Sequence, residues 1–304
     1  MALHESGGVM KQSADPGASI DPGAYTDEYF RTAVEGHREF AASGGRRLSP
    51  RLARALELAH PRPGERVLDI ACGRGEVVLQ SALRSAYALG IDYAEAAMTL
   101  ARRSLDESGG GLRAALARMD AGCLALRPGS FDVALMLDFV EHVPQPELER
   151  SLQEVRRVLR PGGRLVIHTS PNRMFEDVVY RHYVRNVHRL ILGVARPLRV
   201  RGRLFNEWVL PTDPLPPHDE YERQLHVNPQ SAGSLRAALR RCGFRVRRVD
   251  FWEPPRGRFF PAELRWHNVW VGVLDVVRFL RPFSLFPPLN RLFSNHIWIV
   301  AERR

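Results

Sequence analysis

Short apolar runs alternate with amphipathic segments over most of the chain. Between residues 66 and 169, runs rich in Val, Ile, Leu and Ala end in polar or glycine-bearing turns. The stretches between them have apolar residues every three or four positions. The first pattern predicts buried strands, and the second predicts helices. The strands are expected at 66–70, 89–92, 112–119, 131–137 and 164–169, and the helices at 76–88, 94–106 and 145–159.

Strands that alternate with helices of this length predict an α/β fold with a parallel sheet. Right-handed crossovers would place the loops that follow the strands on one edge of that sheet. Outside this region the same patterns predict helices over 24–40, 50–59 and 230–242, and strands over 244–251 and 296–301. Ser49 is the expected N-cap of the second of these helices, and Gly243 is expected to end the third.

The chain divides into a leader, a core and two insertions. Residues 1–23 are rich in Gly, Ser, Ala and Pro and are expected to be disordered. Residues 24–304 are expected to form one domain, with its core at 60–171, 226–252 and 296–304 and cap insertions at 172–225 and 253–295. In the first insertion, arginines interleave with apolar residues over 174–196, which predicts a basic amphipathic helix.

The turn after the first expected strand carries the most specific local signal. Asp69 lies near the end of the strand, and Gly73 and Gly75 lie in the turn before the helix that starts at Glu76. Ligands of open parallel sheets bind at the carboxyl ends of strands, and glycine allows a close backbone approach. An acidic residue before the glycines suits an amino-bearing ligand better than an anion. A tight turn without any ligand would show the same short pattern.

Carboxylates also end the next two expected strands. Asp92 is placed to accept hydrogen bonds from ribose hydroxyls, and Asp120 and Ala121 are placed to read an adenine edge. Taken singly, each aspartate is more simply a helix cap or a loop residue. Four consecutive strands that end in polar or acidic turns are better explained by a nucleoside site at this edge.

With these motifs the chain resembles the class I S-adenosylmethionine-dependent methyltransferases, of the small-molecule type related to the ubiquinone and menaquinone biosynthesis enzymes. The resemblance covers about 67–170 and extends to Asn228–Phe251. Its motifs are Val67–Gly75, Gly90–Tyr93, Met119–Ala121, Gly129–Asp132, Val140–Val143 and Val158–Gly163. It implies a Rossmann-like, seven-stranded, mostly parallel sheet with helices on both faces and the last strand antiparallel. The insertions would be helical caps after the fifth strand and between the sixth and seventh.

The resemblance also implies S-adenosylmethionine as the cofactor. Its amino acid end would lie on the 69–75 loop, its ribose on Asp92, and its adenine near Asp120 and Ala121. In this loop Ala71 replaces the family's usual first glycine, which the family often tolerates. The implied cofactor-binding residues are Asp69, Ala71, Cys72, Gly73, Gly75, Asp92, Tyr93, Met98, Asp120, Ala121, Met136 and Leu137.

Methyl transfer is a displacement at carbon, so that positioning and desolvation contribute most of the catalysis. A hydroxyl acceptor also benefits from a general base. His142 is the candidate base because it follows the fourth strand, and His226 is a weaker one. A structural histidine that braces the next helix is the alternative for His142.

The three cysteines are far apart and lack metal-binding spacing, which suits a reducing, cytoplasmic setting, and no metal is expected.

The net charge of +10 comes almost entirely from arginine. A GC-rich coding genome would explain this bias, as would attraction to nucleic acid or to a membrane surface. The arginine face of 174–196 could bind an anionic substrate, contact a membrane peripherally or simply be solvated.

The tryptophans of the insertions and their borders could line an acceptor pocket or pack within a cap. They are Trp208, Trp252, Trp266 and Trp270.

The expected function is therefore methyl transfer to a small-molecule, glycan or lipid-linked acceptor, with oxygen favoured. An RNA methyltransferase is an alternative motivated by charge, but no separate RNA-binding module is evident, so no nucleic acid partner is expected. A nicotinamide oxidoreductase is a third hypothesis, and the missing third glycine argues against it. A non-catalytic binding module with the same fold is the fourth. The sequence does not indicate the oligomeric state.

Overall fold

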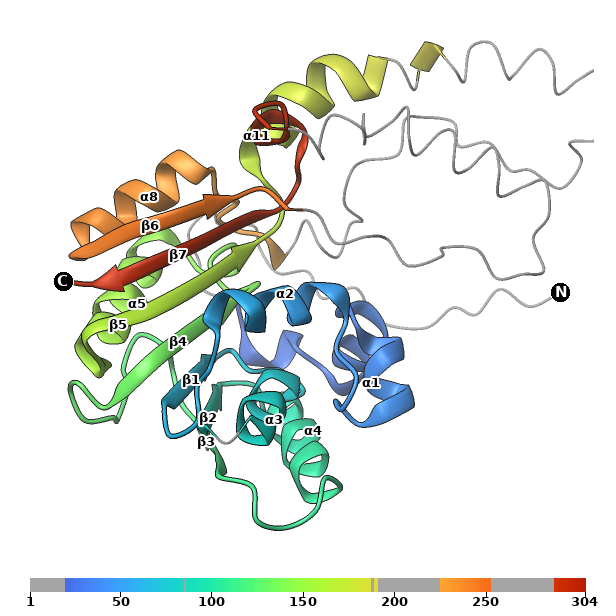
Figure 1. Cartoon of the computed structure of the whole chain (residues 1–304). Helices are drawn as coiled ribbons and strands as arrows, with labels where there is room; N and C mark the ends of the chain where they lie inside the picture. The colour runs from blue at the N-terminus through green and yellow to red at the C-terminus, as the bar shows by residue number, and fades with distance from the viewer. Residues whose placement is uncertain (1–19, 85, 187–188, 191–224, 253–286) are drawn as a thin grey trace, which may run out of the picture.

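A computed structural model describes residues 20–84, 86–186, 189–190, 225–252 and 287–304 (Figure 1). The strands are β1 Arg66–Ile70, β2 Tyr87–Asp92, β3 Ala114–Arg118, β4 Phe131–Leu137, β5 Leu159–Thr169, β6 Phe244–Asp250 and β7 Ile297–Arg303. The α-helices are α1 His37–Ser43, α2 Pro50–Ala59, α3 Glu76–Leu83, α4 Glu95–Asp106, α5 Gln145–Val158, α8 Ala232–Arg241 and α11 Asn290–Phe293. A 3-10 turn η1 (Pro22–Ala24) and the π-helices η2 (Tyr29–Ala33) and η3 (Phe175–Val184) complete the elements.

The seven strands form one sheet in the order β3-β2-β1-β4-β5-β7-β6. Pairings are parallel from β3 through β5, and β7 runs antiparallel to both of its neighbours. The order reverses direction between β1 and β4, which is the switch point where such sheets bind ligands. The predicted Rossmann-like, seven-stranded sheet with an antiparallel last strand is confirmed.

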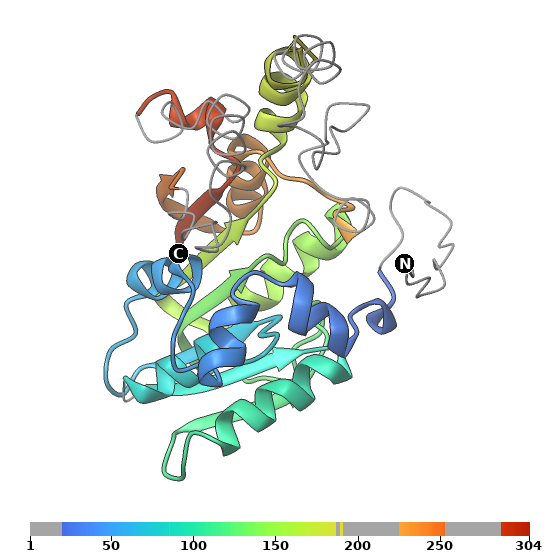
Figure 2. The ribbon, with the colours of Figure 1, turned by 90° about the vertical axis from the view of Figure 1, so that its right-hand side faces the viewer.

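Helices cover both faces of the sheet (Figures 1 and 2). On one face, α5 and α8 pack over strand side chains that include Leu68 and Ile70. On the other face, α2 and α3 pack over the alternate positions, such as Val67 and Val133. Both faces are therefore apolar, so the core strands read as continuous hydrophobic runs.

The expected helix over 24–40 is wrong. The structure has η1, η2 and α1 instead, with an extended backbone at Val34 and a left-handed one at Gly36, whose φ is 81°. The Val34 and Glu35 carbonyls, which lie between η2 and α1, accept hydrogen bonds from the Arg74 side chain. These bonds replace the helical hydrogen bonds that a continuous helix would have made there. The described residues begin at 20, inside the segment 1–23 that was expected to be disordered; Ile20 is buried there, and η1 starts at Pro22.

Two other boundaries shift. The helix expected to reach residue 88 ends at Leu83, and β2 starts at Tyr87 rather than at 89. The strand expected at 164–169 starts earlier, because β5 begins at Leu159. Leu159 pairs with Phe131 and Arg164 pairs with Val133, so the register between β4 and β5 is irregular at this point.

The predicted basic helix over 174–196 is described at residues 174–186 and 189–190. It contains η3, in which Phe175 and Val179 are buried against Tyr180 and Phe293. Most of both expected cap insertions lies outside the described residues, as do Trp208, Trp266 and Trp270. No helix among the described residues is both long and apolar enough to span a membrane.

Candidate active site

A cavity of about 870 Å³ lies at the carboxyl ends of the central strands. Its floor is formed by the loops after β1, β2, β3 and β4, and the segment 20–35 covers part of it. Its volume is in the upper part of the range of small-molecule sites. The cavity brings together most of the predicted site residues, namely Asp69, Ala71, Cys72, Gly73, Asp92, Tyr93, Asp120, Ala121, Leu137, His142 and His226.

The loop after β1 forms a tight left-handed turn. Gly73 and Gly75 have φ values of 52° and 80°, and Ala71 has a φ of 56°. The left-handed conformation costs a residue with a Cβ about 1–2 kcal/mol. Ala71 therefore occupies a backbone conformation that glycine would adopt without strain, which agrees with the glycine usual in the family at this position.

Asp92 connects the ends of two strands. Its carboxylate accepts hydrogen bonds from the Gly73 N–H (3.0 Å) and the Ala94 N–H (2.9 Å), and its side chain is buried at the cavity wall. Burial raises its pKa, while these N–H groups oppose the rise. Each carboxylate oxygen can accept a second hydrogen bond. Asp92 thus fixes the glycine loop and can still accept hydrogen bonds from a ligand's hydroxyl groups.

Asp69 is a buried carboxylate at the cavity wall, and no described residue donates a hydrogen bond to it. Burial and then the nearby Glu76 and Asp92 raise its pKa well above the usual range. A buried carboxylate in such a setting is stabilised by a cation. The protonated amino group of an amino acid would supply that charge, so this end of the cavity fits the amino acid part of S-adenosylmethionine.

Tyr93 and Ala121 lie at the β2 and β3 ends of the cavity, next to Asp120. Asp120 accepts a hydrogen bond from the Gly122 N–H (2.7 Å), so its carboxylate also shapes its own turn.

Three predicted cofactor residues do not line this cavity. Met136 is fully buried in the core on the α5 side, because alternation along β4 directs its side chain away from the site. Met98 lines a different, shallower depression beside α4. Gly75 caps α3 and packs against Ala101. A contact of these three residues with the ligand stays a prediction.

Arg74, which the sequence did not single out, fastens the N-terminal cover to the glycine loop. Its buried guanidinium donates to the carbonyls of Phe30 and Glu35 and to the Glu76 carboxylate, each at 2.8 Å. The ring of Phe40 lies 5.1 Å from its Cζ atom, within cation–π range. Through these contacts residues 30–35 are held over the cavity.

His142 lies on the cavity wall, as predicted, and it meets His226. Its Nδ1 lies 3.1 Å from the Leu225 carbonyl, and its ring centroid lies 5.0 Å from that of His226. Asn228 donates from its side chain to the Val143 carbonyl at 2.9 Å, which fastens the segment before α8 to the loop after β4. Residues that are far apart in sequence therefore share one wall of the cavity.

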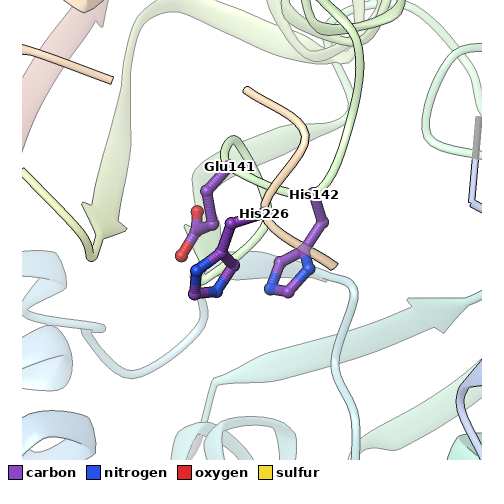
Figure 3. A group of neighbouring side chains, drawn as sticks. All are labelled: Glu141, His142 and His226. Carbon is purple, nitrogen blue, oxygen red and sulfur yellow. The ribbon is translucent and has the colours of Figure 1, made fainter. Parts of the chain in front are cut away.

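Glu141 joins these two histidines. Figure 3 shows the three side chains extending in the same direction from two loop segments, with their ligand atoms within 4.8 Å of one another. Two imidazoles and a carboxylate could hold a divalent cation. Glu141 also accepts a hydrogen bond from the Thr169 hydroxyl (3.0 Å), so it braces the end of β5.

The pKa of Glu141 predicts a pH-dependent stability. Burial and then the charge of Asp138 raise that pKa from 4.5 to about 8. A carboxyl group whose pKa is raised by folding stabilises fully below pH 4.5, and this contribution is lost as the pH rises through about 8. We therefore expect the free energy of unfolding to fall between pH 5 and pH 8, and to fall less in Glu141→Gln. Urea unfolding of both proteins at several pH values, with a chelator present, measures this. The same dependence of the unfolding free energy on pH in the native protein and in Glu141→Gln would contradict it.

A further line of titratable groups was not found from the sequence. His168 Nδ1 lies 2.5 Å from Asp138 Oδ1, and His168 Nε2 lies 2.9 Å from His296 Nδ1. Arg51 from α2 pairs with Asp138 and with Glu35. Asp138, Arg51 and His296 line the cavity. Asp138 directly follows Leu137 and is the acidic residue at the fourth strand end, but its partners His168 and His296 are distant in the sequence.

Trp252 does not line this cavity. Its ring lies 6.0 Å from that of Trp298, and its carbonyl accepts a hydrogen bond from the Trp298 indole N–H. It packs with the cluster beneath α2, so the structure favours core packing over a role in the acceptor pocket for this tryptophan.

Comparison with known proteins agrees with this geometry. A family model described as a methyltransferase domain matches residues 67–163. A ubiquinone biosynthesis O-methyltransferase of Idiomarina loihiensis is 29% identical over 55% of this chain and 57% of its own length. A demethylmenaquinone methyltransferase of Thermus thermophilus is 34% identical over 46% of this chain and 64% of its own length. The chain thus spans less than two thirds of either relative.

A solved structure supports the fold over a larger part of the chain. The S-adenosylmethionine-dependent methyltransferase from Mesorhizobium loti aligns with a TM-score of 0.50 and 19% identity, over 84% of this chain and 98% of that protein. At this identity the likeness concerns the fold alone. Together with the matched domain and the acidic residues at the carboxyl edge of the sheet, it shows that the chain contains a class I S-adenosylmethionine-dependent methyltransferase domain.

Proposed function

We propose that the protein transfers a methyl group from S-adenosylmethionine to a hydroxyl oxygen of a small-molecule, glycan or lipid-linked acceptor. The observation that carries the proposal is that Asp69 and Asp92 line the same cavity as His142 and His226. The carboxylates match the amino group and ribose hydroxyls of the cofactor. The relatives whose names specify quinone-pathway methyltransferases support an acceptor of that general kind.

The chain's own residues would position the reactants and exclude water. When bound, the cofactor supplies a methyl group on a positively charged sulfur. Asp69 and Asp92 would hold it against the glycine loop, and the cover that Arg74 fastens would keep water from the transferred group. The histidine wall would then face the acceptor, where a general base can take the hydroxyl proton. His142 as that base remains a prediction.

Binding and transfer can be measured separately. Calorimetry should show micromolar binding of S-adenosylmethionine, with no binding of NAD. A tritiated methyl group should then pass to a catechol with a short isoprenoid tail in preference to a matched amine. Preferential labelling of RNA, with steep dependence on salt, would instead support the RNA methyltransferase. Binding of neither cofactor would support the non-catalytic module.

Peripheral membrane contact is a separate part of the proposal. The described start of the basic segment exposes Val178 and Tyr183 beside Arg181, a combination typical of helices that lie on anionic membranes. Co-sedimentation with vesicles that contain an anionic lipid tests it, with neutral vesicles as the control. If equal amounts of protein sediment with the anionic and the neutral vesicles, the electrostatic contact is contradicted. A cytoplasmic location also remains a prediction.

A further inference from the structure

Asp138, His168 and His296 form a hydrogen-bonded line that ends at the cavity. Asp138 follows β4, His168 lies in β5, and His296 immediately precedes β7. His168 is completely buried, with its ring centroid 4.2 Å from that of Trp298. The distance from His168 Nδ1 to Asp138 Oδ1 is 2.5 Å, and that from His168 Nε2 to His296 Nδ1 is 2.9 Å. Both are within hydrogen-bond distance. A carboxylate is thus connected to a cavity-lining imidazole through one intervening imidazole.

The carboxylate fixes which nitrogens carry protons. Burial alone would raise the pKa of Asp138, but the charge of Arg51 and the hydrogen bond from His168 hold it below its usual range. Asp138 is therefore an acceptor, so His168 Nδ1 must donate to it. Burial lowers the pKa of His168, which keeps that imidazole neutral despite the opposing effect of Asp138. A neutral imidazole with Nδ1 protonated has a lone pair on Nε2.

The same logic extends to the cavity wall. Because His168 Nε2 is an acceptor, His296 Nδ1 must donate to it across the 2.9 Å link. In neutral His296 the lone pair then lies on Nε2, the nitrogen that can accept a further proton. The chain of hydrogen bonds therefore presets the basic tautomer of a histidine that lines the cavity.

We propose that His296 is the general base for the acceptor hydroxyl, and that Asp138 and His168 are positioning residues that fix its tautomer and stabilise its protonated form. This assignment rests on the proposed function. The hydroxyl proton passes to His296 Nε2, and the oxygen uses a lone pair to bond the methyl carbon. The bond from that carbon to sulfur breaks as its electron pair passes to sulfur. The imidazolium returns its proton to solvent after the product leaves.

The surrounding charges favour this role over the same role for His142. Around His168, the carboxylates of Asp138 and Glu35 share the single guanidinium of Arg51, which leaves one net negative charge to stabilise a nearby imidazolium. His142 Nδ1 lies 3.1 Å from the neutral carbonyl of Leu225.

The tautomers can be tested without an acceptor. Long-range proton–nitrogen spectra of the full chain with 15N-histidine, at pH 7.5 with a chelator, report which ring nitrogen is protonated. His168→Gln and His296→Gln assign the signals. We expect both histidines to carry the proton on Nδ1, with Nε2 bare. Protonation of His168 or His296 at Nε2 would overturn the proposal, because the chain would then run in the opposite direction.

Kinetics test the role itself, with the isoprenoid catechol as acceptor. His296→Gln should lower kcat about 10²–10⁴-fold, with the S-adenosylmethionine Kd within about twofold of native as evidence of an intact fold. His142→Gln should lower kcat far less. Asp138→Asn should shift the acid limb of the kcat profile to lower pH, because the imidazolium loses its counter-charge. A purely structural role would leave that limb in place.

The outcomes separate the two proposals. If the native protein methylates the catechol and His296→Gln is equally active, the base assignment fails while the proposed function stands. If the native protein neither binds the cofactor nor labels any acceptor, the proposed function fails. The base assignment falls with it, while the nitrogen spectra still show whether the hydrogen-bonded chain exists.

Discussion

Replacing Arg74 with methionine is expected to lower the free energy of unfolding by about 3–5 kcal/mol, as for other broken buried ion pairs. Arg74 and Glu76 pair at 2.8 Å, and their side chains are only 2% and 7% exposed. Without the guanidinium, the Glu76 carboxylate would be buried without its cation. The carbonyls of Phe30 and Glu35 would also lose their donor.

Urea unfolding measures this loss, and two further variants make it specific. Arg74→Met combined with Glu76→Gln should recover part of the stability, because no unpaired carboxylate remains. Arg103→Met is the matched control, since its ion pair with Glu107 is exposed, and it should leave the unfolding midpoint unchanged. Equal midpoints for Arg74→Met and the control would show that Arg74 does not hold the cover.

The parts of the site encoded by contiguous residues could be predicted from the sequence. The glycine loop, Asp69 and Asp92 follow from a strand, a turn and a helix that are adjacent in the chain, and all three lie at the cavity. The sheet follows as well, because apolar runs separated by amphipathic helices admit few topologies. The bounds of α3 and β2 in this region differ from those predicted, and so does the direction of individual side chains. Met136 and Leu137 are neighbours, yet alternation along β4 brings only Leu137 to the cavity.

Contacts between distant segments could not be predicted in this way. His168 and His296 are 128 positions apart, and they meet only because β5 and β7 pair antiparallel with His168 opposite Trp298. The residues that neighbour His296 in the sequence do not indicate that it is connected to the Asp138 carboxylate through His168. The break of the expected helix at Val34 likewise depends on Arg74, which lies 40 positions later in the chain. Periodicity describes one segment at a time and carries no information about such partners.

Asp92→Ala is expected to weaken S-adenosylmethionine binding by about 10–100-fold, the loss of charge-assisted hydrogen bonds worth about 1.5–3 kcal/mol. Part of that loss is indirect, because the same carboxylate holds the Gly73 and Ala94 N–H groups. Asp92→Asn keeps one acceptor oxygen, so it should retain intermediate affinity. Asp106→Ala, outside the main cavity, is the control and should bind like the native protein. Calorimetry gives the three affinities directly, and an unchanged Kd in Asp92→Ala would remove this carboxylate from the cofactor site.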